Sequence, residues 1–289
     1  MARKIEYSKY HGLENDFVVI NQTGLRLRGE YIADFVRACC ARQTGIGADG
    51  VVLFSLRSGR PQMRLFNADG SEAEISGNGL RILAQHLRRR GLQRERRFKV
   101  ITKVGALQVR LVSGAGLVQQ TEIELARPRF QADLIPMKVQ SKHFVQREFK
   151  TDAGALVGTA VSVGNPHIVF FVDHFDFDWK TYSAGVTIDK RFPEGVNVEF
   201  AVVKTRAQAQ HLSWERGVGP TRACATGAAA VAAAGVMVGL LDHQVEINEL
   251  AGDLQIKASS LDEPLFLTGP SVFIAEGLFH YDLNETHSR

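Results

Sequence analysis

Two segments of this 289-residue chain each start rich in glycine and continue in an apolar helical pattern. They run from Gly77 to Arg90 (GNGLRILAQHLRRR) and from Ala225 to Leu241 (ATGAAAVAAAGVMVGLL). The second segment is apolar on all sides, and a helix of that kind has to be enclosed by the rest of the protein. The residues leading into the two helices match in layout, as Ser76-Gly-Asn-Gly and Cys224-Ala-Thr-Gly, about half the chain apart. We therefore predict an α/β (α+β) fold of two similar halves, each a layer of strands curled around one central helix.

Elsewhere the hydrophobic pattern has mostly a period of two residues, which is typical of strands. The predicted strands cover residues 17–20, 51–54, 63–66, 98–111, 118–125, 161–172, 196–203, 245–258 and 265–275. Hairpin turns are expected at Gly105, Gly252 and Gly269. The amphipathic segment 30–42 predicts one further helix, whose buried face carries Cys39 and Cys40 as small packing residues.

Composition excludes several classes of protein. Apolar residues make up 45% of the chain and charged residues 23%, so bulk disorder is excluded. No apolar run reaches the ~18–20 residues of a membrane span, and the first residues lack the apolar centre of a signal peptide. Three cysteines make no disulfide framework. We expect a cytoplasmic protein with reduced thiols.

The basic residues crowd one stretch, from Arg88 to Lys99, which holds seven cations against Glu95. Such a stretch can be a nucleic-acid or anion patch. It can equally be a solvated helix end, where cations suit the negative end of the helix dipole. Only Phe98 interleaves an aromatic ring there. The second interpretation is favoured, and we expect neither nucleic acid nor a membrane as a partner.

The two helix starts are candidate anion sites, because unpaired N–H groups and the positive end of the helix dipole point at the ligand. A thiol there should have a pKa lowered toward ~3.5–7.5, against ~8.5 for a free cysteine. Cys224 has that placement. The alternative is an inert, buried thiol. Glu215 and Arg216 favour the functional interpretation, because a charge pair beside Gly217 and Gly219 rarely serves packing.

Four asparagines follow or interrupt apolar strands, where this residue is unfavourable. They are Asn15, Asn67, Asn165 and Asn197. Each alone could be a turn residue with a local hydrogen bond, but together with Arg216 they indicate a polar clamp for a substrate. His167 is ambiguous, since a lone histidine is more often structural. No phosphate loop, Rossmann fingerprint or zinc-spaced cluster is present, so we expect no cofactor and no metal.

Seven motifs together resemble the diaminopimelate epimerase family, pyridoxal-independent enzymes of lysine and cell-wall precursor synthesis. The motifs are KYHGLENDFVVI, GIGADGVV, RLFNADGSEAEISGNGLR, GNPH, GVNVEF, ERGVGPTRACATGAAA and LTGP, between Lys9 and about Phe279. The resemblance implies two strand barrels, each around a central helix and related by a pseudo-twofold axis, with the active site in the cleft between them. We place the N-terminal half at residues 1–122 plus 266–289 and the C-terminal half at 123–265. A homodimer and a small amino-acid substrate, LL- or meso-diaminopimelate, are also implied.

The resemblance further implies roles for individual residues. The distal carboxylate and amine of the substrate would be held by Asn67, Asn165, Asn197 and Arg216. The reacting end would be fixed by Asn15 and Glu215. The reacting carboxylate would lie against the helix starts at Gly77, Asn78, Ala225 and Thr226.

The family's chemistry needs two thiols on opposite faces of one carbon, and here the first position is Ser76 while the second is Cys224. A serine hydroxyl is a far poorer base than a thiol of pKa ~8.5. Three interpretations stay open: a slow or asymmetric epimerase that uses Cys224, a thiol replaced by design, or a chemistry changed toward a dehydratase or another racemase. A non-catalytic binding protein is a more remote alternative. Two smaller departures from the family pattern are Glu14 and Ala225, each in place of the usual glycine.

Overall fold

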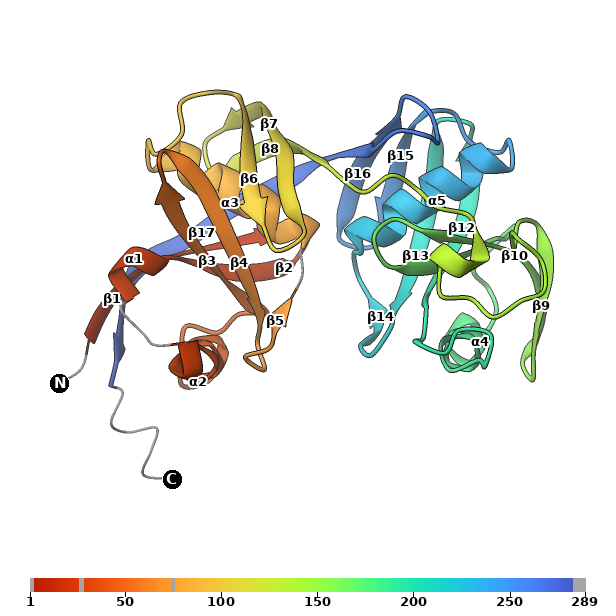
Figure 1. The fold of residues 1–289 in the computed structure, drawn as a ribbon, viewed down its shortest axis with the longest axis horizontal. Helices are drawn as coiled ribbons and strands as arrows, with labels where there is room; N and C mark the ends of the chain where they lie inside the picture. The colour runs from red at the N-terminus through yellow and green to blue at the C-terminus, as the bar shows by residue number, and fades with distance from the viewer. Residues whose placement is uncertain (1–2, 26–28, 74–75, 283–289) are drawn as a thin grey trace. The chain divides into compact units, whose positions relative to one another are not determined.

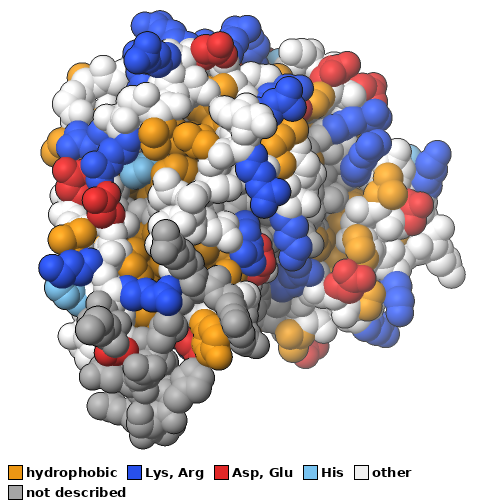
Figure 2. All heavy atoms as spheres, turned by 60° about the vertical axis from the view of Figure 1, so that its left-hand side comes forward, with side chains coloured by type: hydrophobic (Ala, Val, Ile, Leu, Met, Phe, Trp, Pro, Cys, Tyr) orange, Lys and Arg blue, Asp and Glu red, His pale blue; other side chains and the backbone are white. Residues whose placement is uncertain are grey.

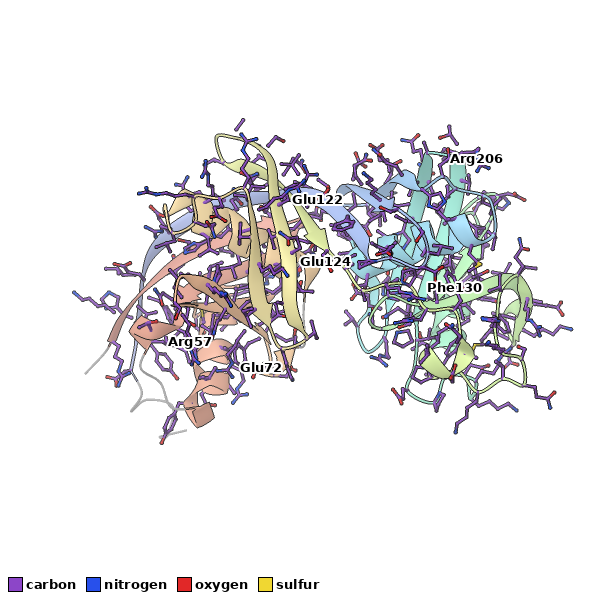
Figure 3. The ribbon with its side chains drawn as sticks, turned by 45° about the horizontal axis from the view of Figure 1, so that its top comes forward. Arg57, Glu72, Glu122, Glu124, Phe130 and Arg206 are labelled. Atoms are coloured by element: carbon purple, nitrogen blue, oxygen red, sulfur yellow. The ribbon has the colours of Figure 1, made fainter. Side chains whose placement is uncertain are left out.

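The structure, a computed structural model, describes residues 3–25, 29–73 and 76–282. The chain divides into two compact units, Met1–Ile123 with Gly269–Arg289, and Glu124–Thr268. Glu122 and Glu124 flank the point where the chain first passes from one unit to the other, and Phe130 lies in the second unit (Figure 3).

The first unit is a barrel of eight strands closed on itself. Its strands are β1 (Arg3–Gly12), β2 (Asn15–Asn21), β3 (Gly50–Arg57), β4 (Arg60–Asn67), β6 (Arg97–Thr102), β7 (Gly105–Ala115), β8 (Val118–Glu124) and β17 (Leu265–Tyr281). They pair in the order β17-β1-β2-β3-β4-β6-β7-β8 and return to β17. The pairs β2–β3 and β4–β6 are parallel. A short strand, β5 (Glu72–Ala73), is added to β4.

Helix α3 (Gly77–Arg89) is enclosed by this barrel and contacts β1, β2, β3, β4 and β7 (Figure 1). Its residues from Gly77 to Leu87 are all buried. Two other helices, α1 (Gln22–Leu25) and α2 (Gly29–Cys40), lie in the crossover between the parallel strands β2 and β3. Cys39 and Cys40 end α2 and are buried in the hydrophobic core against which this helix packs, so the prediction that they are packing residues is confirmed.

The second unit repeats this plan. Its elements are η1 (Ala132–Leu134), β9 (Arg147–Thr151), β10 (Gly154–Ser162), β11 (Pro166–Phe171), α4 (Trp179–Thr187), β12 (Asn197–Thr205), β13 (Gln208–Glu215), β14 (Gly219–Thr221), α5 (Ala225–Met237), β15 (Gln244–Glu249) and β16 (Gly252–Ala258). Here the parallel pairs are β11–β12, across α4, and β13–β15, across α5. Each unit thus has a hairpin, a crossover helix, a second hairpin, a short strand, a central helix and a third hairpin. The predicted fold class is confirmed.

Helix α5 is enclosed in the same way as α3, and it contacts β10, β11, β12, β13, β15 and β16 (Figure 1). All residues from Gly227 to Gly235 are buried, and their small side chains let the strands approach closely. A Cβ atom on Gly235 would lie 2.4 Å from Cδ1 of Leu241, which only glycine avoids. The uniform apolarity of this segment therefore reflects burial on every side.

Some sequence-based elements need correction. The predicted strand 161–172 is two strands, β10 and β11, because the chain turns at Gly164 with a φ of +110°. A turn at Gly269 is wrong, since this residue lies inside β17. The turns at Gly105 and Gly252 are confirmed, as both residues begin the second strand of a hairpin at positive φ. Within the described residues, no helix is long and apolar enough to cross a membrane.

Candidate active site

Ser76 caps the central helix of the first unit. Its backbone is extended, at φ −136° and ψ 128°, and its Oγ accepts a hydrogen bond from the N–H of Gly79 at 3.2 Å. Serine is among the preferred residues at this position, because its oxygen satisfies one of the unpaired N–H groups of the first turn. The predicted first catalytic position therefore lies at a helix start.

Asn15 and Asn78 are joined beside this helix start. Nδ2 of Asn78 donates to Oδ1 of Asn15 at 3.1 Å, and Nδ2 of Asn15 donates to Oδ2 of Asp49 at 3.0 Å. The buried guanidinium of Arg81 donates to Oδ1 of Asn78 at 2.7 Å. The structure thus brings two predicted site residues together and adds Asp49 and Arg81, which the sequence reasoning missed. The spacing of Asn78, Arg81 and Gln85, one turn apart on the same face of a helix that must be enclosed, is a signal that could have found Arg81.

Asn67 stands apart from that pair. It ends β4, is exposed, and donates from Nδ2 to Oγ of Ser71 at 3.0 Å within its own loop. The next residue, Ala68, donates its N–H to the carbonyl of Asp49 at 3.0 Å, so the loop follows the same end of the sheet. The side chain of Asn67 makes no hydrogen bond to Asn15 or Asn78 in the structure described.

Cys224 caps helix α5 as Ser76 caps α3. Its φ of −136° and ψ of 103° are extended, and its Sγ accepts a hydrogen bond from the N–H of Gly227 at 3.3 Å. The layout match seen in the sequence is therefore a match in geometry. Ala225 does not have a positive φ, so its methyl group leaves the helix start undistorted. Oγ1 of Thr226 lies 3.6 Å from the sulfur.

The remaining clamp residues gather in the second unit. Nδ2 of Asn165 donates to Oγ1 of Thr226 at 3.4 Å. Asn197 is buried and donates to the carbonyl of Pro166 at 3.0 Å, while its Oδ1 accepts the N–H of Arg216 at 2.8 Å. It therefore ties the motifs GNPH and ERG together. The guanidinium of Arg216 donates to the carbonyl of Glu194 at 2.7 Å.

The environment of Cys224 raises the pKa of its thiol well above the usual value. Burial is the largest cause, and the negative charges of Glu215, Glu199 and Glu249 add to it. The prediction of a lowered pKa from the helix start alone is thus wrong for this structure, because a thiolate would face three carboxylates in a site removed from water. Burial also raises the pKa of Glu215.

Beneath Cys224 lies a buried network of two imidazoles and two carboxylates. Glu199 binds Nδ1 of His167 at 2.8 Å and Nε2 of His211 at 2.7 Å, and Nδ1 of His211 lies 3.1 Å from Glu249. Burial disfavours charge on Glu199, but the two histidine hydrogen bonds outweigh it and lower its pKa to about 2. Burial likewise opposes charge on His211, while its bonds to both carboxylates raise its pKa to about 9.

The sequence reasoning missed Glu199, His211 and Glu249. Glu199 had a signal, because it is a lone acid inside the apolar run of β12. His211 and Glu249 had no comparable signal, since each is one of several polar residues in its strand.

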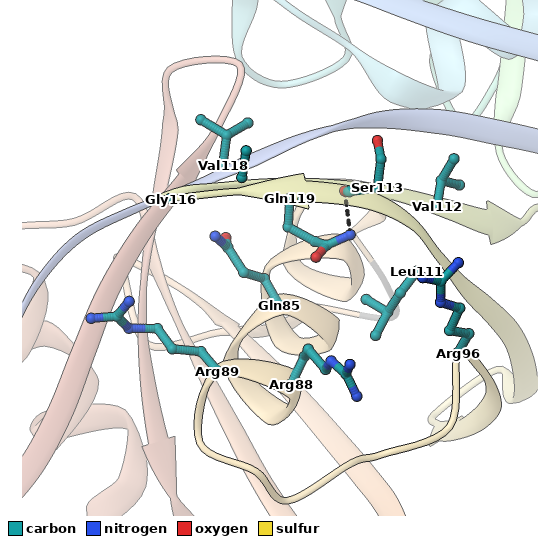
Figure 4. Close-up of a pocket in the computed structure, with 12 residues that line it drawn as sticks. Gln85, Arg88, Arg89, Arg96, Leu111, Val112, Ser113, Gly116, Val118 and Gln119 are labelled. Atoms are coloured by element: carbon teal, nitrogen blue, oxygen red, sulfur yellow. Dashed lines mark hydrogen bonds between the residues drawn. The ribbon is translucent and has the colours of Figure 1, made fainter.

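The basic stretch borders a cavity of about 310 Å³ at the end of α3, lined by Arg88, Arg89 and Arg96 with Gln85 and Gln119 (Figure 4). Arg89 also stacks on the ring of Phe273, 3.8 Å from its centroid. On the face shown in Figure 2, lysine and arginine side chains are spread out, with neutral, hydrophobic and acidic side chains between them. Among the described residues, no three or more histidine, cysteine, aspartate or glutamate side chains are arranged so that they could hold a metal ion.

Comparison with known proteins gives a consistent result. The family model described as diaminopimelate epimerase matches residues 7–124 and 159–274. The diaminopimelate epimerase of Moorella thermoacetica is 36% identical over 281 residues, which cover 96% of this chain and 100% of the relative. That of Methanothermobacter thermautotrophicus is 36% identical over 284 residues, covering 96% and 99%.

Solved structures support the fold. A phenazine biosynthesis protein of the PhzF family from Bacillus anthracis has a TM-score of 0.68 at 14% identity, covering 96% of this chain and 99% of its own. A hydroxyproline epimerase from Agrobacterium vitis has a TM-score of 0.68 at 12% identity, covering 97% and 92%. From the family match and the two near-full-length relatives, we conclude that this chain belongs to the diaminopimelate epimerase family.

Proposed function

We propose that this chain is an isomerase that interconverts LL- and meso-diaminopimelate by proton transfer at the α-carbon, without a cofactor. The observation that carries the proposal is the equivalent placement of Ser76 and Cys224, each the cap of an enclosed helix with its side chain on the third N–H of the first turn. The family match supports the substrate.

In this proposal the helix starts bind the reacting carboxylate. The N–H groups at Gly77, Asn78, Ala225 and Thr226 stabilise negative charge that develops on the carboxylate as the α-proton leaves. The distal end of the substrate is held by Asn67, Asn165, Asn197 and Arg216. Asn15 and Glu215 orient the reacting centre.

The two proton-transferring groups are unequal. Burial and three carboxylates favour the protonated form of Cys224, which therefore rests as a proton donor and acts as a base only in its small thiolate fraction. The hydroxyl of Ser76 donates a proton or positions a water that does. We therefore expect slow epimerisation whose rate rises with pH, because the thiolate fraction grows about tenfold per pH unit below the thiol pKa.

A second candidate is a changed reaction on a related amino acid, and Ser76 is the observation that favours it. A hydroxyl at the first position cannot supply the second thiol that the family's epimerisation uses. In that case the chain would be a dehydratase or another racemase. Failure of both reactions would leave a non-catalytic binding protein.

The test is incubation of each diaminopimelate stereoisomer with the protein in deuterated water. Epimerisation places solvent deuterium at the inverted α-carbon, and we expect Ser76→Cys to raise the rate by about 10²-fold or more, as restoring a general acid–base group does. Ser113→Cys, which adds a thiol on the exposed part of β7, is the matched control and should change nothing. Retention of α-hydrogen by both stereoisomers in both the unmodified chain and Ser76→Cys would refute the proposal.

The family resemblance also supports a cytoplasmic homodimer that binds a small amino acid and neither nucleic acid nor membrane. Sedimentation velocity of the full chain should give twice the chain mass. Binding of a labelled DNA duplex at 50 mM salt that weakens steeply by ~200 mM salt would contradict the partner assignment.

A further inference from the structure

The buried groups beneath Cys224 form a closed ring of contacts that starts and ends on that residue. The N–H of Cys224 donates to Oε1 of Glu249 at 2.8 Å, and the same oxygen lies 3.1 Å from Nδ1 of His211. Nε2 of His211 continues to Glu199 at 2.7 Å. The path so far joins strands β15, β13 and β12.

The ring returns through the clamp. Glu199 binds Nδ1 of His167 at 2.8 Å, and Nε2 of His167 lies 2.8 Å from Oδ1 of Asn165. Nδ2 of Asn165 donates to Oγ1 of Thr226, which contacts the Cys224 sulfur. The contacts thereby connect the backbone nitrogen of Cys224 with its own thiol, and the path passes through the side-chain amide of Asn165. The proposed function assigns that amide to substrate binding.

The ring is poorly explained by stability. The side chains of His167, Glu199, His211 and Glu249 are at most 2% exposed. Buried ion pairs of this kind often contribute nothing to stability relative to apolar residues of the same size. Moreover, Oε2 of Glu249 is buried and has no hydrogen-bond partner among the described residues, which costs free energy.

The backbone also makes room for the ring. A Cβ atom on Gly227 would lie 2.7 Å from Oε2 of Glu199, so only glycine at this position lets the carboxylate reach the first turn of α5. The carboxylate of Glu199 and the sulfur of Cys224 thus approach the same turn, since the N–H of Gly227 is the one that the sulfur accepts.

We propose that Glu249 and His211 are positioning residues that fix the backbone of Cys224 and set the acidity of its thiol, and that they couple both to the amide of Asn165. The charged groups that face the thiol are Glu215, Glu199 and Glu249, and the two imidazoles lie behind them. The catalytic importance of these residues rests on the proposed function. The test below measures the reactivity of the thiol directly, so the two proposals can fail independently of each other.

The test compares Glu249→Gln with the unmodified chain. Glutamine keeps the shape and an acceptor for the N–H of Cys224 but removes one negative charge. Reaction of Cys224 with methyl methanethiosulfonate, followed by mass spectrometry of its peptide across pH 6–10, reports the thiolate. We expect the rate at a fixed pH below the thiol pKa to rise about threefold to tenfold in Glu249→Gln.

The matched control is Glu246→Gln on the same strand, whose carboxylate binds Gln208, Asn248 and Gln255 instead. It should leave the rate unchanged. An unchanged or lower rate in Glu249→Gln, or an equal rise in the control, overturns the proposal. In an active enzyme, Glu249→Gln should also move the pH profile of kcat to lower pH with little change in KM.

A second measurement needs no variant. In the 15N-labelled chain, the backbone amide of Cys224 and the side-chain amide of Asn165 should titrate with one shared midpoint, that of the His211 ring. Different midpoints, or no titration of the Asn165 amide, would show that the ring does not couple the two groups and would overturn the proposal even if Glu249→Gln fails to fold.

Discussion

At the scale of single residues, Ser76 and Cys224 are the same structural device with one atom changed. Both are extended caps that accept the N–H of the third helical residue. Serine performs the capping role well, and its substitution for cysteine therefore leaves the fold intact while it changes the proton chemistry. On the proposed function, the fold and the proton transfer therefore make separate demands on this position.

A second residue-scale feature is the turn between β1 and β2, where Leu13 has a φ of +53° and Glu14 a φ of +64°. Side chains other than glycine are strained in this region. We expect Glu14→Gly to raise the free energy of unfolding by about 1 kcal/mol, because glycine adopts this conformation without the clash. Urea unfolding measures the change. The control is Glu95→Gly, at a loop position without a positive φ, and it should not raise the free energy of unfolding.

At the scale of elements, the charged ring ties four strands of the second unit to the start of α5. It makes a pH-dependent contribution to stability. The pKa of His211 is about 9 in the folded chain against 6.5 in the unfolded chain, so its contribution is complete below pH 6.5 and lost as pH rises through 9. The pKa of Glu199 is about 2 against 4.5, so its contribution is complete above pH 4.5 and lost as pH falls through 2.

We therefore expect the free energy of unfolding of the unmodified chain to decrease between pH 6.5 and 9.5. His211→Gln should be destabilised at pH 6 and should show a flatter dependence over the same range. The measurement is urea unfolding at several pH values. His174→Gln removes an exposed histidine of the same unit and should follow the unmodified chain; an equal slope in all three proteins would contradict the role of His211.

The sequence predicts the central elements well and the peripheral ones poorly, for physical reasons. Helix α5 is predictable because every side chain after Thr226 is apolar, a pattern that only complete enclosure explains. Helix α4 was not predicted, since its nine residues mix polar and apolar side chains without a clear period. Strand β13 was missed because two adjacent polar residues, Gln210 and His211, break its alternation. Gly269 suggested a turn, but strand pairing on both sides of it overrides the local preference for one.

The candidate site, too, is only partly predictable from the sequence. Ser76, Cys224 and the asparagines were found because they stand at helix starts and strand ends, where backbone groups lack partners. The raised pKa of Cys224 was not predictable, because it depends first on burial and then on carboxylates, of which Glu199 and Glu249 reach the thiol from strands that are remote in sequence. Only the tertiary fold brings these carboxylates to one helix start.

At the scale of the whole molecule, the two units share a strand. Residues 265–268 of β17 pair with β16 in the second unit, and residues 272–281 pair with β1 in the first. The first unit is therefore assembled from both ends of the described chain, with Arg3 opposite Tyr281. The first barrel is thus encoded by two separate pieces of sequence, whereas the second unit is the single piece Glu124–Thr268 between them.

We expect a fragment of residues 1–123 to be unfolded or aggregated, because without β17 the edges of β1 and β8 are unpaired. Joining residues 269–289 to it through a flexible Gly-Ser linker should restore a folded unit. Far-UV circular dichroism and the dispersion of 15N amide signals distinguish the two fragments. A cooperative, well-dispersed fragment without β17 would contradict this account.

Strand β17 also orders events during translation. Among the described strands β1 is synthesised first and β17 last, so β17, one of the two partners of β1, emerges some 270 residues after it. Contacts at such separations form slowly and leave unpaired edges exposed while they are awaited. The first barrel can close only once β17 has been synthesised, so we expect the nascent chain to depend on chaperones that cover the unpaired edge of β1 until then.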